Sequence, residues 1–141
     1  MDVGGFRDMH RHRRCVQIMQ PFAGTLHGCD TPEDLVEAGL GQRYGAVMRR
    51  IADADHRLTR TEHSHEAGQY IVPMAFRCRT LFKMDFAEAH YISELRTTPA
   101  GHFSYRHVAY AMYEAVAKRY PALAKYFRVH DVHEPVDLLK R

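Results

Sequence analysis

The residues whose types and spacing point most directly to chemistry are Arg11-His12-Arg13. Consecutive basic side chains repel one another unless an anion offsets their charge, and guanidinium groups bind phosphate oxygens in a paired geometry. The tripeptide therefore predicts a site for a phosphate or pyrophosphate group. The alternative is a solvated basic turn close to the N-terminus of the chain.

A second polar group lies where the sequence predicts the start of a long helix. His102 and Ser104 precede the tripeptide Tyr105-Arg106-His107, and Arg96 lies shortly before them. Free backbone amides and the helix dipole favour anions at such a position. We therefore regard Arg96 and this cluster as a second candidate site, against the alternative of a capped helix with basic residues on its surface.

Histidines are numerous, eleven in all, so their spacing must decide whether they bind a metal. His56 precedes the run His63-Ser64-His65, and His27 lies next to Gly28-Cys29. Neither arrangement fixes a third and a fourth ligand at the spacing that a structural metal site requires. We therefore predict no metal site and expect these histidines to be solvated.

Three cysteines, Cys15, Cys29 and Cys78, are far apart in the sequence. An odd number without a CxxC pair indicates reduced thiols and predicts a cytoplasmic protein. Cys15 follows Arg14, a neighbour that could lower the pKa of a nucleophilic thiol. The alternative, which is more frequent in proteins, is that Cys15 is a small apolar residue that begins the apolar stretch 16–19.

Length and composition favour one folded domain over residues 1–141. Hydrophobic residues make up 45% and charged residues 26% of the chain, which is ordinary for a globular protein. No apolar run reaches the roughly 18 residues of a membrane span, so we expect no membrane partner. A net charge of +3 suits an anionic small molecule. It disfavours nucleic-acid binding through the basic stretch 7–14, which we keep as a third hypothesis.

The first half of the chain predicts an irregular segment, 1–30, followed by two helices. Thr31-Pro32 with two acids after it is typical of a helix start, with Thr31 as the capping residue. This helix should run to Ala38, and Gly39 should interrupt it. The apolar residues of the next helix predict one buried face: Tyr44, Val47, Met48 and Ile51.

The second half predicts a strand and two longer helices. Alternating apolar and basic residues over 75–84 indicate a strand with one buried face. Asp85 and Glu88 form a capping-box pattern for a helix that ends before Pro99. A helix over 103–119, a short helix from Pro121 to Phe127 and a peripheral tail over 129–141 complete an α+β fold that is mostly helical with a small sheet.

Three segments in order resemble the flavin-dependent thymidylate synthases, the ThyX family. Arg11-His12-Arg13 resembles the start of the family signature. The run from Glu66 to Pro73 is similar to the segment before the family's strand. The third segment is Glu94-Leu95-Arg96 with Pro99, His102 and Arg106 after it. Each motif is short, so their order and spacing carry the resemblance.

This resemblance implies a homotetramer that binds FAD and dUMP and transfers a methyl group to dUMP, giving dTMP. By resemblance, Arg11, His12 and Arg13 would contact the flavin and the nucleotide, and His102 would stand where the family has a glutamine that meets the cofactor. Arg96 would be the catalytic arginine that polarises the pyrimidine. The cofactor would carry the chemistry of reduction, and the protein would supply orientation and charge.

The chain departs from the family at most positions that hold dUMP. A serine, a glutamate and an arginine of the family correspond to Pro21, Met19 and Ala23 here, and further departures fall on Asp8, Gln69, Asp85 and Ala87. Each lost charge-assisted contact costs about 1.5–3 kcal/mol, so we expect the family's usual turnover to be lost while a dUMP-like nucleotide or another anionic small molecule remains the expected ligand. The alternative is a non-catalytic assembly or binding module, or half of a larger two-domain protein, with the tail as an arm that contacts a subunit.

Overall fold

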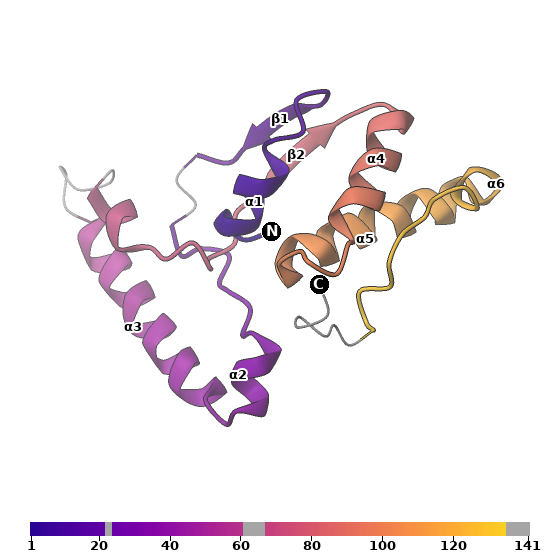
Figure 1. The fold of residues 1–141 in the computed structure, drawn as a ribbon. Helices are drawn as coiled ribbons and strands as arrows, with labels where there is room; N and C mark the ends of the chain where they lie inside the picture. Colours follow the sequence, from indigo (N-terminus) through magenta and orange to yellow (C-terminus); the bar gives the residue numbers. More distant parts are fainter. Residues whose placement is uncertain (22–23, 61–66, 135–141) are drawn as a thin grey trace. The chain divides into compact units, whose positions relative to one another are not determined.

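A computed structural model describes residues 1–21, 24–60 and 67–134 of the chain (Figure 1). The fold is mostly helical with one small two-stranded sheet, which confirms the predicted α+β class. The chain packs as two compact units. Unit 1 contains Met1, Gly5–Ile18 and Thr80–Arg141, and unit 2 contains Asp2–Gly4 and Met19–Arg79. The expectation of a single domain over 1–141 stays a prediction.

The first thirty residues are more regular than predicted. Helix α1 spans Val3–Met9 and strand β1 spans Val16–Met19. Two adjacent glycines, Gly4 and Gly5, weigh against a helix on propensity alone. The burial of Met9, whose exposed fraction is 0%, shows why the helix forms: its last residue fills the core of unit 1, and packing of this kind outweighs propensity.

The strand predicted over 75–84 is regular only at its end, because β2 spans Thr80–Lys83 and pairs with β1 (Figure 1). The predicted alternation is nevertheless confirmed along the whole segment. Phe76 and Cys78 are buried, and Phe82 and Met84 are half-buried. Thr80 is half-buried as well, and the four residues that alternate with these side chains are exposed: Arg77, Arg79, Leu81 and Lys83. Side chains on successive residues of an extended chain point to opposite faces, which explains this pattern.

Helix α4 spans Phe86–Arg96 and begins as the sequence predicts. The Asp85 carboxylate accepts a hydrogen bond of 2.8 Å from the backbone amide of Glu88. The reciprocal half of the capping box is replaced, because the Glu88 side chain contacts His12 at 3.2 Å. The hydrogen bond to the Glu88 amide and the nearby Arg14 guanidinium lower the pKa of Asp85, so its carboxylate stays charged at neutral pH.

Helix α5 spans Phe103–Arg119, as predicted, and packs against α4 (Figure 1). The core of unit 1 lies between these helices and α1. Its fully buried members are Met9, Ile92 and Ala109, and half-buried side chains such as Phe82 and Met112 pack around them. Burying such side chains is the main stabilising term for the unit.

The C-terminal helix α6 is shorter than predicted and spans Pro121–Ala124. The chain beyond it turns back onto α4 instead of leaving the unit. The backbone amide of Arg128 donates to Glu94 at 2.7 Å, and that of His130 donates to the Thr97 hydroxyl at 3.1 Å. Val132 is buried. The part of the predicted tail from 129 to 134 is therefore packed, and residues 135–141 lie outside the described residues.

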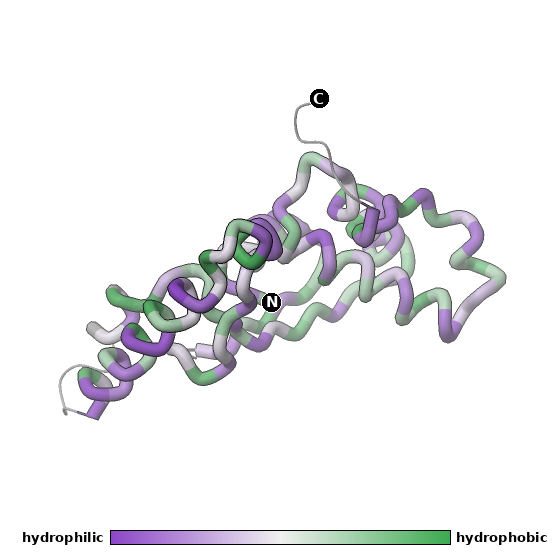
Figure 2. Tube along the Cα trace, turned by 90° about the horizontal axis from the view of Figure 1, so that it is seen from below, coloured by the Kyte–Doolittle hydropathy of each residue, from purple (hydrophilic) through white to green (hydrophobic). Residues whose placement is uncertain are grey.

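Unit 2 contains the helices α2 (Glu33–Glu37) and α3 (Gly41–Leu58) and the 3-10 turn η1 (Ala67–Ile71). Gly39 has a φ of +71° between the two helices, a conformation that glycine adopts without strain. The prediction that Thr31 caps α2 is wrong: the capping position is Pro32, and no side chain makes the cap bond. Polar and apolar residues alternate around α3 (Figure 2), although Val47 is exposed where the sequence predicted burial.

A buried carboxylate holds unit 2 together. Asp55, which is 7% exposed, accepts hydrogen bonds from the Thr25 amide at 3.1 Å and the Thr25 hydroxyl at 2.9 Å. Gly24 has a φ of +51°, and an added Cβ there would lie 2.7 Å from an Asp55 oxygen. The loop therefore approaches α3 too closely for any side chain at Gly24.

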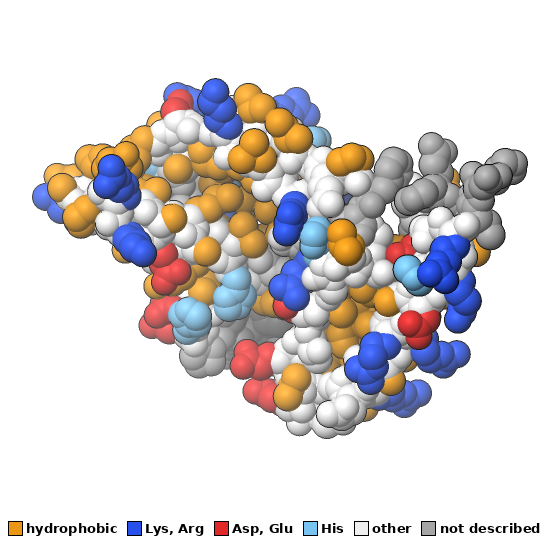
Figure 3. Space-filling view, turned by 180° about the vertical axis from the view of Figure 1, so that it is seen from behind, with side chains coloured by type: hydrophobic (Ala, Val, Ile, Leu, Met, Phe, Trp, Pro, Cys, Tyr) orange, Lys and Arg blue, Asp and Glu red, His pale blue; other side chains and the backbone are white. Residues whose placement is uncertain are grey.

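Hydrophobic side chains also lie on the surface among basic ones (Figure 3). On the sheet these are Val16 and Ile18, each 58% exposed, and Leu81, which is 60% exposed. None of the helices within the described ranges is long and apolar enough to cross a membrane.

Candidate anion site beside a buried histidine

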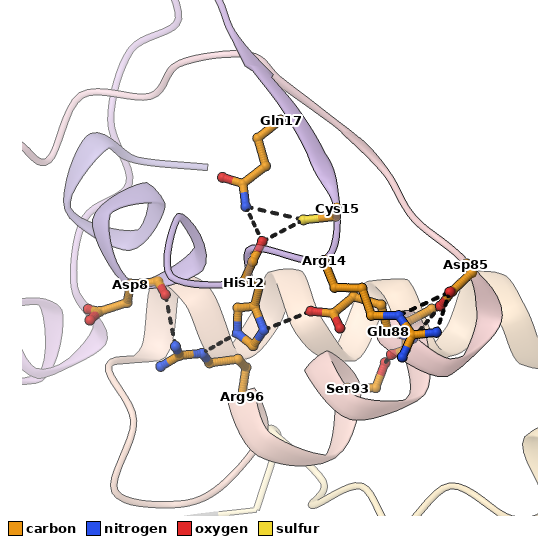
Figure 4. Close-up of polar contacts among 10 residues, drawn as sticks. Asp8, His12, Arg14, Cys15, Gln17, Asp85, Glu88, Ser93 and Arg96 are labelled. Atoms are coloured by element: carbon orange, nitrogen blue, oxygen red, sulfur yellow. Dashed lines mark hydrogen bonds and ion pairs between the residues drawn. The ribbon is translucent and has the colours of Figure 1, made fainter.

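The side chain of His12 lies at the centre of a polar network inside unit 1 (Figure 4). His12 is 4% exposed and Glu88 is 6% exposed. The Nδ1 atom of His12 lies 3.2 Å from a carboxylate oxygen of Glu88. On the other side of the ring, Nε of Arg96 donates to Nε2 of His12 at 2.8 Å. Both nitrogens of the imidazole are therefore occupied.

These partners fix the protonation state of the ring. An arginine only donates, so Nε2 of His12 must accept and carries no proton. A neutral ring then carries its proton on Nδ1, from where it donates to the Glu88 carboxylate. Burial and the Arg96 charge lower the pKa of His12, with the hydrogen bond to Glu88 acting in the opposite direction. The imidazole is thus neutral at pH 7.

Helix α4 supplies both partners of His12 from one face. Glu88, Ile92 and Arg96 are spaced by four residues, which places them in a row along the helix. Ile92 is fully buried between the two polar residues. In Figure 4 the Glu88 and Arg96 side chains extend from α4 toward His12. Arg96 also donates from Nη2 to the backbone carbonyl of Asp8 at 2.8 Å, so α4 is tied to the end of α1.

The backbone of His12 is held as firmly as its ring. Its carbonyl accepts from the Gln17 side-chain amide at 2.6 Å and from the Cys15 thiol at 2.9 Å. The Gln17 side chain then contacts His10 Nδ1 through its oxygen at 3.0 Å. These contacts close the turn that joins α1 to β1.

The turn places its two outer arginines on an open cavity of about 670 Å³, which is lined by His10, Arg11, Arg13, Cys15 and Gln17. Arg11 lies 3.7 Å from the Asp8 carboxylate and has a side chain that is 69% exposed. Arg13 is exposed, and no hydrogen bond or ion pair links it to any residue that the structure describes. The cavity therefore presents two guanidinium groups, and no carboxylate is among its lining residues.

Arg14 belongs to the same basic run but has a different role. Its Nε and Nη2 atoms donate to one oxygen of Asp85 at 3.1 and 2.7 Å. Both side chains are more than half exposed, so this ion pair contributes little to the free energy of unfolding. Arg14 does not line the cavity.

The other predicted site residues lie apart from the cavity lining. His102 precedes α5, and its Nδ1 accepts from the Ser104 amide at 3.4 Å. Arg96 lies 5.6 Å from the centre of the Tyr105 ring. The buried Arg106 donates to the Thr97 carbonyl at 3.1 Å, and its Nη2 atom has no hydrogen-bond partner in the described part of the chain. The ligand roles predicted for Arg11, His12, Arg13, Arg96 and His102 stay predictions.

No cluster of three or more histidine, cysteine, aspartate or glutamate side chains could hold a metal ion within residues 1–21, 24–60 and 67–134. His63 and His65 lie outside these ranges. His27, the other candidate ligand, donates from Nε2 to the side-chain oxygen of Gln20 at 2.8 Å.

Sequence reasoning missed Glu88 and Gln17 as parts of the site. The sequence predicts Glu88 only as a capping residue, although a glutamate at a helix position that also faces the core needs a buried partner. The signal in the sequence is the four-residue spacing of Glu88, Ile92 and Arg96, which places an apolar residue between two polar ones on one helix face. No pattern in the sequence indicates a role for Gln17, because a polar residue on a short strand is ordinary.

Comparison with known proteins assigns the chain to a family. Residues 3–122 match the family described as thymidylate synthase complementing protein. A UPF0159 protein of Chlamydia muridarum is 34% identical over 133 residues, which cover 94% of this chain and 25% of that protein. A UPF0159 protein of Thermoplasma acidophilum is 33% identical over 124 residues, or 87% of this chain and 24% of that one. The chain thus spans about a quarter of the length of these curated relatives.

Two solved structures share the fold at low sequence identity. The flavin-dependent thymidylate synthase ThyX of Helicobacter pylori, solved with FAD and dUMP, has a TM-score of 0.66 and 14% identity; the match covers 90% of this chain and 69% of that one. The UMP/dUMP methylase PolB of Streptomyces cacaoi, bound to 5-Br UMP, has a TM-score of 0.64 and 15% identity, with coverages of 92% and 73%. The match over most of the chain and the shared fold lead to one conclusion: the chain belongs to the thymidylate synthase complementing protein family.

Proposed function

We propose that this chain is a ThyX-like domain that binds FAD, with the pyrophosphate of the cofactor held by Arg11 and Arg13. The observation that carries the proposal is the cavity lined by these two arginines next to the buried His12 network. Arg13 supports it most directly, because it is an exposed cation on the cavity wall without a partner in the described part of the chain.

The residues present fit such a group. Two guanidinium groups offer paired donors for phosphate oxygens, and the Gln17 and His10 side chains add polar groups to the same wall. When bound, the flavin would supply the redox chemistry. The chain itself would bind the pyrophosphate, orient the cofactor and balance its negative charge.

We propose that turnover of dUMP to dTMP is not retained in full. By resemblance, Asp8 replaces a glutamine of the family just before the signature, and Asp85 replaces an asparagine that opens the flavin-facing helix, so both positions carry a carboxylate where the family has an amide. In this chain they lie beside Arg11 and Arg14 and partly neutralise them. Like charges disfavour a phosphate at such a place, so we propose flavin binding with reduced or absent methyl transfer.

The test is a titration of the purified chain, followed by visible absorbance and flavin fluorescence, with FAD and in parallel with riboflavin. Riboflavin has the same ring system without phosphate. The proposal expects saturable binding of FAD, much weaker binding of riboflavin, and a further spectral shift on addition of dUMP if the nucleotide pocket survives. Equal binding of both flavins, or binding of neither, would rule out a pyrophosphate site.

A second candidate is a non-catalytic assembly module or one part of a larger protein. The exposed apolar face of the β1–β2 sheet, with Val16, Ile18 and Leu81, favours it, as does the much greater length of the curated relatives. By resemblance the assembly would be a homotetramer. Light scattering at several concentrations tests this candidate: a chain that stays monomeric at all of them would contradict it, and FAD binding would then decide on the first candidate alone.

A further inference from the structure

The His12 ring is sealed off from the cavity that its two neighbours line. It is 4% exposed, both of its nitrogens are occupied, and it is absent from the cavity wall. A side chain in this state has no donor or acceptor left for a ligand. Its contribution to an anion site must therefore pass through the position of the backbone on either side of it.

We infer that Glu88 is a positioning residue for this site: with Arg96 it clamps the His12 ring, which fixes the turn and directs Arg11 and Arg13 to the cavity. The inference rests on the proposed function for the identity of the ligand, but the clamp itself is a property of the free protein. The Glu88 side chain lies 3.2 Å from Nδ1 of the ring, and Glu88 is not among the residues that line the cavity.

The geometry of the turn shows how the clamp acts. His12 is attached to α4 through its ring and to Cys15 and Gln17 through its carbonyl. Gln17 itself lines the cavity. A residue fixed at both its side chain and its carbonyl leaves its neighbours little backbone freedom, which reduces the conformational entropy that ligand binding would otherwise cost.

The two partners of the ring, the Glu88 carboxylate and the Arg96 guanidinium, require a neutral imidazole. Glu88 and Arg96 contribute opposite charges on either side of the ring, and the Asp8 carbonyl accepts the second bond of Arg96. The other titratable groups next to His12 are Tyr91 of α4, whose ring lies 5.7 Å away, and the Cys15 thiol. A protonated His12 would direct an N–H group at the Arg96 Nε–H donor, so acid should open the clamp.

Replacement of Glu88 distinguishes a positioning role from a purely electrostatic one, because the two roles predict opposite changes in FAD affinity. Removing a carboxylate near an anion site should strengthen anion binding if only charge matters. If Glu88 acts by positioning, Glu88→Ala should weaken FAD binding by about fivefold to tenfold, the loss of roughly one ordered hydrogen bond. Glu88→Gln keeps an oxygen acceptor for Nδ1–H, so its affinity should stay within about twofold of the wild type or rise slightly.

The experiment combines FAD titrations of the three proteins with ¹⁵N NMR of the histidine rings in the free wild-type chain, with the His12 signals assigned by their loss in His12→Gln. The inference expects a His12 ring with its proton on Nδ1 at pH 7.5, weaker FAD binding by Glu88→Ala and rescue by Glu88→Gln. A proton on Nε2, a doubly protonated ring, or FAD affinity in Glu88→Ala equal to or tighter than the wild type would overturn it.

These experiments distinguish a failure of the Glu88 clamp from a failure of the proposed FAD binding. If the wild-type chain binds no FAD, the proposed function fails, and the NMR result alone decides whether the clamp exists. If Glu88→Ala does not fold by circular dichroism, Glu88→Leu replaces it, since leucine fills a similar volume without an acceptor and carries the same expectation of weaker binding.

Discussion

Arg13 and Arg14 are adjacent arginines with different surroundings, which makes them a matched pair for testing the anion site. Arg13 lines the cavity, is exposed and makes no ion pair with the described residues. Arg14 donates two hydrogen bonds to Asp85 and does not line the cavity. Replacement by glutamine removes the same charge at both positions and keeps a side chain of similar size.

The expected loss for Arg13→Gln follows from its contact. A hydrogen bond to a charged group contributes about 1.5–3 kcal/mol, and solvent exposure of Arg13 places the value at the lower end. At about 1.4 kcal/mol for each factor of ten, FAD should bind about tenfold more weakly. Arg14→Gln breaks an exposed ion pair outside the cavity, so its FAD affinity should stay within about twofold of the wild type.

Fluorescence titration with FAD at fixed ionic strength, with riboflavin as the phosphate-free comparison, measures the difference. Because the lost contact is to phosphate, riboflavin affinity should not change in either variant. Equal losses for the two variants would mean that the net charge of the basic run acts, and not its geometry. An unchanged affinity in Arg13→Gln would refute the assignment of Arg13 to the site.

Four further predictions concern stability. The first three are checked by chemical or thermal unfolding, and the fourth is checked by hydrogen exchange. The folded-state pKa of His12 lies below its ordinary value of 6.5. The contribution of His12 to the free energy of unfolding should therefore be complete above pH 6.5 and decrease as the pH falls from 6.5 toward the folded-state pKa. His12→Gln should make the free energy of unfolding depend less on pH in this range, and an unchanged pH dependence would contradict the buried neutral ring. Met9→Ala should cost about 2–5 kcal/mol, because Met9 is fully buried, and a cost near zero would mean that α1 does not pack as described. Asp55→Ala should cost about 2–3 kcal/mol, since it leaves the Thr25 amide and hydroxyl without their acceptor; faster proteolysis of the loop at Thr25 would accompany it. Thr97→Val removes the acceptor of the His130 amide and should raise hydrogen exchange at that amide, while protection equal to the wild type would show that the segment 129–134 is held by other contacts.

Much of the fold follows from periodicity, and the parts that do not follow have identifiable causes. The segment 75–84 alternates in the sequence and in the structure, because its inner residues are buried or half-buried whether or not the backbone pairs with a neighbour. The helix over 103–119 has clear end signals and the predicted bounds. Helix α1 was missed because its Gly4-Gly5 pair gives the wrong local signal, and only the distant packing of Met9 overrides it.

The sequence indicates the basic residues of the candidate site, but it predicts neither the roles of Glu88 and Gln17 nor the orientation of the side chains. The basic run predicts an anion site, and this assignment stays a prediction. The sequence carries no sign that His12 turns inward while Arg11 and Arg13 reach a cavity. That division depends on Glu88 and Arg96, which lie 76 and 84 residues away in the chain. Pairings at such separation between single polar residues leave no local pattern to read.

The central claim is that the guanidinium groups beside the His12 clamp bind a pyrophosphate. The most direct measurement is the ³¹P NMR spectrum of FAD during titration with the wild-type chain and with Arg13→Gln. We expect both pyrophosphate resonances to shift and broaden as the wild-type chain is added, and to do so only at higher concentrations of Arg13→Gln. Resonances that stay unchanged with the wild-type chain in excess would contradict the claim, whatever the flavin ring itself does.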